Sequence, residues 1–223
     1  MQHRSKSSEE KVMIGTGNGN CLPFKDVGGT KPAERNTAIL TGTEELHLRV
    51  QQLSLREQLE RNHFLLMRLN AASARLIQSM EQLDAFEAIA EIIANLVGCE
   101  EIAIFDYHPG AQNFSLAWSS GVEESAMQPF CCGAGMFGRA AQQGMSLYQE
   151  RQPETLLLPH EKNLTACIVL KSSDEVVGVV AMFGLLPQKS KLEWTDFELL
   201  KFLETYGAVA VKFQRLQGKQ VSP

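Results

Sequence analysis

The sequence predicts an α+β fold, in which a long helix and a second helix precede two hairpins with a short helix between them, and another long helix follows. Three observations predict it. Residues 44–81 have a heptad-like pattern, paired apolar runs flank turn sequences at 109–110 and 172–175, and residues 195–216 form a strongly apolar helical segment. Hairpins enclosed by helices in this order are typical of the α+β class.

Composition limits the classes of function. The chain has 223 residues, 44% hydrophobic residues and a formal net charge of -5, which fits one soluble domain with extensions and argues against a nucleic-acid partner. No apolar run approaches the ~20 residues that a membrane-spanning helix needs, so we expect no membrane insertion. The odd number of cysteines and the lack of a recognisable export signal predict reduced thiols in a cytoplasmic protein.

The two ends are predicted to lack stable structure. Residues 1–43 are rich in Gly, Ser, Asn, Lys and Thr, and they offer too few apolar groups to offset the entropy of ordering. We therefore expect a disordered tail over 1–43 and a short disordered segment over 218–223.

Residues 44–81 are predicted to form one long helix with a coiled-coil seam. Leucines recur every seven residues from Leu48, and a second series interleaves with them at the complementary spacing. Asn62 lies on the seam, where a polar residue fixes register at some cost in stability. We expect 44–65 to form a dimerisation stalk and 66–81 to pack on the domain as well.

The last helix has an apolar surface wider than one sheet can cover. Its start is predicted at a capping box, Thr195-x-x-Glu198, and a similar box at Asp84-x-x-Glu87 starts a helix that Gly98 ends. Two apolar stripes run along 195–216. The sheet is expected to cover one of them, and either the first helix or a second chain is expected to cover the other. The residues that we expect to mediate dimerisation are Leu48, Leu55, Leu59, Asn62, Leu66, Leu69, Phe202, Tyr206, Val209 and Phe213.

Three phrases resemble the GAF domain family, in the order that this family has them. They are a Gly-rich turn with a short helix over 133–144, a strand with a central glycine over 175–181, and the opening of the last helix at 195–200. The resemblance implies a GAF domain over 66–217, preceded by the long coiled-coil helix. Its central antiparallel sheet is expected to carry the terminal helices on one face, and loops and short helices around a ligand pocket on the other. We also expect the first and last helices to bring both termini to one end of the domain.

The resemblance makes a set of aromatic and sulfur-containing residues candidates for that pocket, although the same residues are equally able to form a filled core. The short segment 151–163 leaves little room for the lid helix of cyclic-nucleotide members, and no Cys-His pair supports bilin attachment. We expect no cofactor and no metal. The candidate pocket residues are Phe105, Tyr107, Trp118, Phe130, Phe137, Cys167 and Met182.

Adjacent Cys131 and Cys132 are open to more than one interpretation. They are able to form a strained vicinal disulfide or to supply soft metal ligands, for which Cys167 and His160 are the further candidates, but free thiols fit better. They also lie just before the turn that carries the reactive cysteine of free methionine sulfoxide reductases, an enzymatic GAF lineage. The sequence thus predicts a non-enzymatic, homodimeric signalling protein that binds another protein. Gating by a small ligand in the pocket stays open, and the reductase is the enzymatic alternative.

Overall fold

The computed structural model describes residues 32–148, 158 and 161–220. The chain divides into two compact units, Met1–Gln52 and Leu53–Pro223, and each is described by itself. The described part of the first unit is helical and belongs to α1 (Pro32–Gln82), whose remainder lies in the second unit. α1 begins at Pro32, which corrects the coil expected over 32–43, and a proline is well suited to a first helical turn. Residues 1–31 of the predicted tail lie outside the described residues.

The second unit is built on one antiparallel sheet, which confirms the predicted α+β class. The strand order is β3-β2-β1-β6-β5-β4, and every neighbouring pair is antiparallel. The long hairpins β1–β2 and β5–β6 meet at the centre, where β1 pairs with β6. The strands are β1 (Ile102–His108), β2 (Asn113–Ser120), β3 (Phe130–Cys131), β4 (Leu147–Tyr148), β5 (Ala166–Ser172) and β6 (Glu175–Met182).

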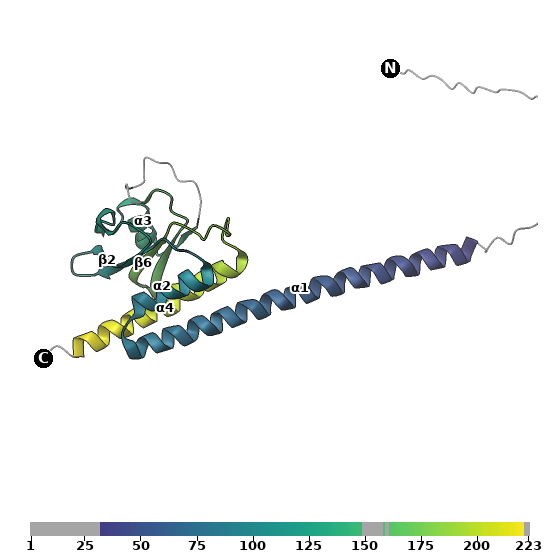
Figure 1. The fold of residues 1–223 in the computed structure, drawn as a ribbon, viewed down its shortest axis with the longest axis horizontal. Helices are drawn as coiled ribbons and strands as arrows, with labels where there is room; N and C mark the ends of the chain where they lie inside the picture. Colours follow the sequence, from purple (N-terminus) through teal and green to yellow (C-terminus); the bar gives the residue numbers. More distant parts are fainter. Residues whose placement is uncertain (1–31, 149–157, 159–160, 221–223) are drawn as a thin grey trace, which may run out of the picture. The chain divides into compact units, whose positions relative to one another are not determined.

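Helices from both ends of the second unit cover one face of this sheet (Figure 1). α2 (Ala85–Ile92) continues as the π-helix η1 (Ile93–Val97), and α4 (Trp194–Gln220) lies beside them. Ala72 and Leu76 of α1 join the same buried cluster. α4 continues to Gln220, so the disorder expected from 218 is corrected for 218–220, while 221–223 lie outside the described residues.

The opposite face is covered by α3 (Gly135–Gln143), and the 3-10 turn η2 (Glu124–Ala126) lies on the path toward it. The side chains of this face form a second buried cluster that is separate from the helix-covered one. Strand residues alternate between the two clusters, because successive side chains point to opposite faces of a sheet. Both faces of the central strands are therefore filled by the protein itself.

The helix starts differ from the predicted capping boxes. Asp84 makes no side-chain cap, because its carboxylate pairs with Arg75, and Gln214 accepts from the backbone N–H of Ala85 instead. α4 starts at Trp194, and Asp196 accepts from the backbone N–H of Glu193 at 2.7 Å. The reciprocal half of a capping box is thus present two residues earlier than expected.

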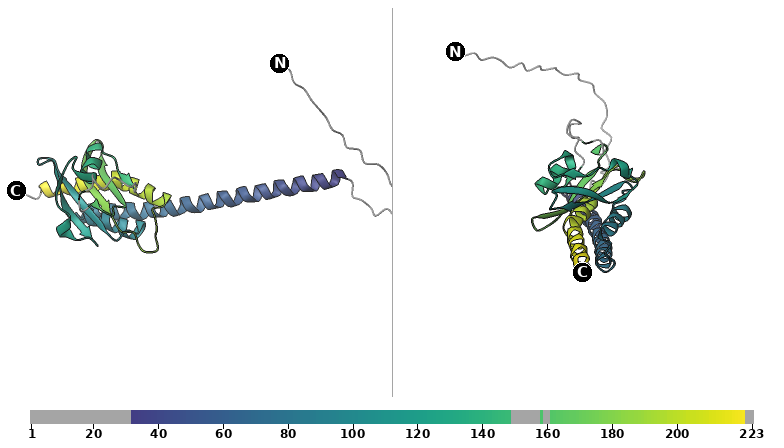
Figure 2. Two further views of the ribbon diagram at one scale, coloured as in Figure 1. Left: turned by 90° about the horizontal axis from the view of Figure 1, so that it is seen from above. Right: turned by 90° about the vertical axis from the view of Figure 1, so that its left-hand side faces the viewer.

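The second half of α1 and α4 run in the same direction along the domain (Figures 1 and 2). Arg68 of α1 contacts Asp196 at the start of α4, whereas Gln214 near the end of α4 contacts Ala85, just after α1 ends. The expectation that both termini meet at one end is therefore wrong, because the end of α4 lies at the far end from the entry of α1. Among the described residues, no helix is both long enough and apolar enough to cross a membrane.

Candidate functional site

The face that a GAF ligand was expected to occupy is packed with phenylalanine rings. The ring centroid of Phe130 lies 5.0 Å from that of Phe105, 4.8 Å from that of Phe114 and 5.6 Å from that of Phe137. All four side chains are buried. Such pairs contribute about 0.5–1.5 kcal/mol each beyond the burial of their area. The arrangement is that of a closed aromatic core.

The structure does not bring the seven predicted pocket residues together, which corrects the expectation of one pocket. The rings of the phenylalanines among them and the thiol of Cys167 lie in the cluster beneath α3, with Tyr107 at its edge. Met182 and Trp118 lie in the opposite cluster, beneath the helices. Trp118 is the cross-strand partner of Ile104, whose side chain also faces the helices, and partners in a ladder share a face.

A buried carboxylate that the sequence did not reveal closes the start of α3. Glu161 is 1% exposed and accepts hydrogen bonds from the backbone N–H groups of Phe137 at 2.8 Å and of Leu158 at 2.7 Å. A Cβ on Gly135 would lie 2.4 Å from its carboxylate, so glycine is required there. The carboxylate satisfies an N–H at the start of α3, where a negative charge is favourable. Glu161 is distant in sequence from α3, and no local pattern marks this role.

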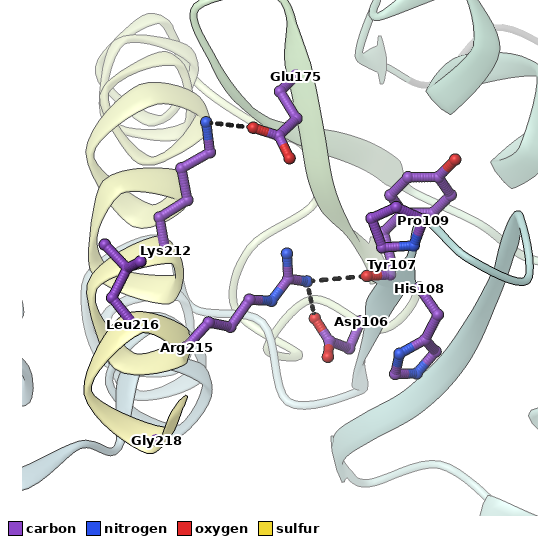
Figure 3. Close-up of a pocket in the computed structure, with 9 residues that line it drawn as sticks. All are labelled: Asp106, Tyr107, His108, Pro109, Glu175, Lys212, Arg215, Leu216 and Gly218. Carbon is purple, nitrogen blue, oxygen red and sulfur yellow. Dashed lines mark hydrogen bonds and ion pairs between the residues drawn. The ribbon is translucent and has the colours of Figure 1, made fainter. Parts of the chain in front are cut away.

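An open cleft of about 490 Å³ lies between the C-terminal part of α4 and the ends of β1 and β6 (Figure 3). Arg215 donates to the carboxylate of Asp106, to the Tyr107 carbonyl at 3.1 Å and to the Val177 carbonyl at 2.7 Å. Lys212 pairs with Glu175 at 2.7 Å, and this ion pair lowers the pKa of that carboxyl group. These charges neutralise one another and attach α4 to the sheet, so the cleft offers no free charge for a ligand at these positions.

The described cysteines form two classes. Cys99 and Cys167 are buried, and burial raises the pKa of Cys99 to about 11 and that of Cys167 further. Cys131 and Cys132 are exposed free thiols. Cys131 ends β3 and Cys132 begins the following turn, in which the Ala134 N–H donates to the Cys131 carbonyl at 3.0 Å. His160 lies outside the described residues, and within the described part no group of three or more His, Cys, Asp or Glu is placed to hold a metal ion.

The feature that a folded monomer leaves unexplained is a stripe of exposed apolar side chains on α1 within the second unit. Leu55, Leu59 and Leu66 are 59%, 69% and 65% exposed, and Asn62 lies on the same side of the helix. Toward the C-terminal end the heptad series turns onto the domain, because Leu69 is partly buried and Leu76 is 3% exposed. A straight helix drifts relative to a seven-residue repeat in this way.

α4 carries a second apolar stripe on the side away from the sheet. Tyr206 and Val209 are exposed, and the Tyr206 ring stacks on the partly buried ring of Phe202 at 4.5 Å between centroids. Phe213 is half-buried on the same side. Contiguous exposed apolar surface of this kind marks interaction sites. Of the residues predicted to dimerise, Leu48 is also exposed but lies in the first unit.

Comparison with solved structures identifies the fold. The chain superposes on the GAF domain of a phosphoenolpyruvate-protein phosphotransferase from Acinetobacter with a TM-score of 0.55 and 14% identity, over 69% of this chain and 98% of that one. The corresponding domain from Coxiella burnetii gives 0.54 and 14%, over 70% and 96%. The GAF domain/HD domain protein from Geobacter sulfurreducens gives 0.51 and 16%, over 63% and 98%. No protein-family profile and no curated protein matches the sequence. The chain has the GAF fold, and these likenesses establish the fold alone.

Proposed function

We propose that this chain is a regulatory GAF-domain protein that acts as a homodimer and passes its signal by binding another protein, without catalysing a reaction. The observation that carries the proposal is the pair of exposed apolar stripes on α1 and α4. The heptad spacing of Leu55, Leu59, Asn62 and Leu66 suits a second copy of the same helix, because such a seam buries identical positions against each other.

We assign partner binding to the other side of α1. Leu53, Phe64 and Met67 are 60%, 56% and 60% exposed, and at 3.6 residues per turn they lie away from the Leu55–Leu66 stripe. A dimer that uses the first stripe leaves this second group free for a different protein. The packed aromatic core argues for a signal that arrives through protein contact rather than through a small ligand.

Disulfide trapping tests the seam directly. We expect Asn62→Cys, in a background with Cys21→Ser, Cys131→Ser and Cys132→Ser, to form an intermolecular disulfide under mild oxidation. In a parallel seam the two copies of position 62 face each other, and a disulfide needs Cα atoms about 4.4–6.8 Å apart. Glu60→Cys is the matched control, because Glu60 is also exposed but lies off the seam. Equal trapping at 60 and 62 would contradict a parallel seam.

The reductase alternative has one favourable observation, which is the exposure of Cys131 and Cys132 just before the Gly-rich turn. Against it, the turn and first helical residues, 133–138, hold no thiol. We expect no turnover when the protein is incubated with free methionine sulfoxide and a thioredoxin system. Turnover that disappears in Cys132→Ser would replace the proposed function by the enzymatic one.

A further inference from the structure

A buried cluster of charges joins α1 to the domain at the level of Arg68. The guanidinium of Arg68 donates to the carboxylate of Asp196 at 2.7 Å and to the carbonyl of Leu96. Lys189 donates to the other carboxylate oxygen of Asp196 at 2.7 Å and to the carbonyl of Val97. The side chains of Arg68 and Asp196 are 7% and 2% exposed, so solvent screens their interaction little.

The cluster ties together segments that are far apart in the sequence. Leu96 and Val97 are the last residues of the π-helix η1, whose terminal carbonyls lack helical partners. Asp196 also caps the start of α4, and Lys189 belongs to the connection between β6 and α4. A π-helix is a rare arrangement that recurs at functional positions. Two cations on its final carbonyls complement the negative end of this helix.

The cluster restricts the rotation of α1 about its own axis, whereas the neighbouring apolar contacts of α1 do not. Burial of Ala72 and Leu76 is non-directional, whereas hydrogen bonds from a planar guanidinium permit only a narrow range of rotation of the helix about its axis. Buried ion pairs contribute little net stability against apolar replacements and in some proteins serve specificity instead. The Arg68 Nε lacks a hydrogen-bond partner, which fits a group retained for its geometry rather than for stability alone.

A chain of contacts connects this cluster with the aromatic core on the opposite face. The ring centroids of Phe183 and Phe137 lie 6.3 Å apart. The backbone N–H of Phe183 donates to the Glu101 carbonyl at 2.9 Å. The segment between β6 and α4 then contacts Gly98, the residue that follows η1, because the Leu186 N–H donates to the Gly98 carbonyl at 2.9 Å. Lys189 follows one turn later in the same segment. Backbone and hydrogen bonds therefore connect Phe183 with Asp196 and Arg68, so a displacement of Phe183 can be transmitted to them.

We propose that the Arg68–Asp196–Lys189 cluster is the joint that sets the rotation of α1 on the GAF unit and couples the interior of the domain to the dimer seam. The second part of this proposal, the coupling to the dimer seam, rests on the proposed function because it requires the dimer. Arg68 lies between Leu66 and Leu69 in the sequence. Rotation of α1 about its axis at this point therefore changes the direction in which the seam residues face relative to the domain. Arg68 is a positioning residue that acts through the helix.

The joint itself is tested in a monomeric background, Leu59→Glu with Leu66→Glu, by amide hydrogen exchange. Arg68→Met should speed exchange of the amides around 66–72 by roughly tenfold or more, because it removes hydrogen bonds between charged groups and leaves a buried acceptor with fewer donors. Arg68→Lys should restore part of the protection. Arg75→Met is the matched control. Arg75 lies further along α1, and this variant removes its ion pairs with Asp84 and Glu91. It should leave the exchange of the amides at 66–72 unchanged. Unchanged exchange in Arg68→Met overturns the joint.

The coupling is tested by a double-mutant cycle on the dimer dissociation constant. Phe183→Leu, which removes the ring contact with Phe137, should change this constant by at least about fivefold in the otherwise native chain. The change should vanish with Arg68→Met and persist with Arg75→Met. If it persists with Arg68→Met, or is absent from the start, the cluster is structural only and the coupling is overturned. A monomeric wild type overturns the proposed function and the coupling with it, whereas the exchange experiment still decides whether the joint exists.

Discussion

Replacing Leu59 and Leu66 by glutamate is expected to convert the proposed dimer into a monomer. Both side chains are largely exposed in the isolated chain, so the fold of one copy does not depend on them. Burying a leucine side chain contributes about 1.5–3 kcal/mol, and a dimer loses four of them in this variant. Its dissociation constant should therefore rise by at least about a thousandfold, which sedimentation or light scattering measures directly.

The matched control is Leu53→Glu with Met67→Glu. These residues are similarly exposed on the same helix but lie on the other side, where we assign partner binding. This variant should remain a dimer and lose the partner. If both variants dissociate to the same extent, the assignment of the two sides is wrong, and if neither does, α1 is not the interface.

Phe105→Ala should lower the free energy of unfolding by about 3–5 kcal/mol. Phe105 is 0% exposed and contacts the rings of Phe130 and Phe137, so truncation leaves a cavity at the centre of the aromatic core. Denaturant unfolding measures the loss, at one fixed protein concentration because dimerisation adds to the apparent stability.

Phe64→Ala is the control for this measurement, because Phe64 is 56% exposed. Among the ring interactions of the described residues, its ring contacts only the guanidinium of Arg68, whose Cζ lies 5.4 Å from the ring centroid. It should cost less than about 1 kcal/mol. A loss below about 1.5 kcal/mol in Phe105→Ala would indicate a loosely packed face that leaves room for a ligand, and would reopen the question of a pocket.

The elements that the sequence predicted correctly are those that local pattern determines. Strand pairs around short turns, the left-handed glycine at Gly98 and the long helix α1 are all predicted by residues close together in the chain. These patterns also reveal which side of α1 is apolar, because helical periodicity alone fixes it. The exposure of Leu55, Leu59 and Leu66 agrees with that prediction without testing the dimer.

The predictions that failed depend on partners distant in the sequence. Asp84 was expected to cap a helix, but a well-placed Arg75 takes its carboxylate. Trp118 was assigned to the pocket face, yet its pairing opposite Ile104, next to an irregularity in the β1–β2 ladder, places it under the helices. Glu161 and the Arg68–Asp196 pair join residues that no local pattern relates, so only the folded structure brings them to notice.

The molar mass of the intact wild-type chain in solution tests the central claim most directly. Light scattering at low micromolar concentration should give twice 24.7 kDa, because the apolar stripes on α1 and α4 are then covered by a second copy. A mass of 24.7 kDa at that concentration would contradict the homodimer and leave the exposed stripes to another protein.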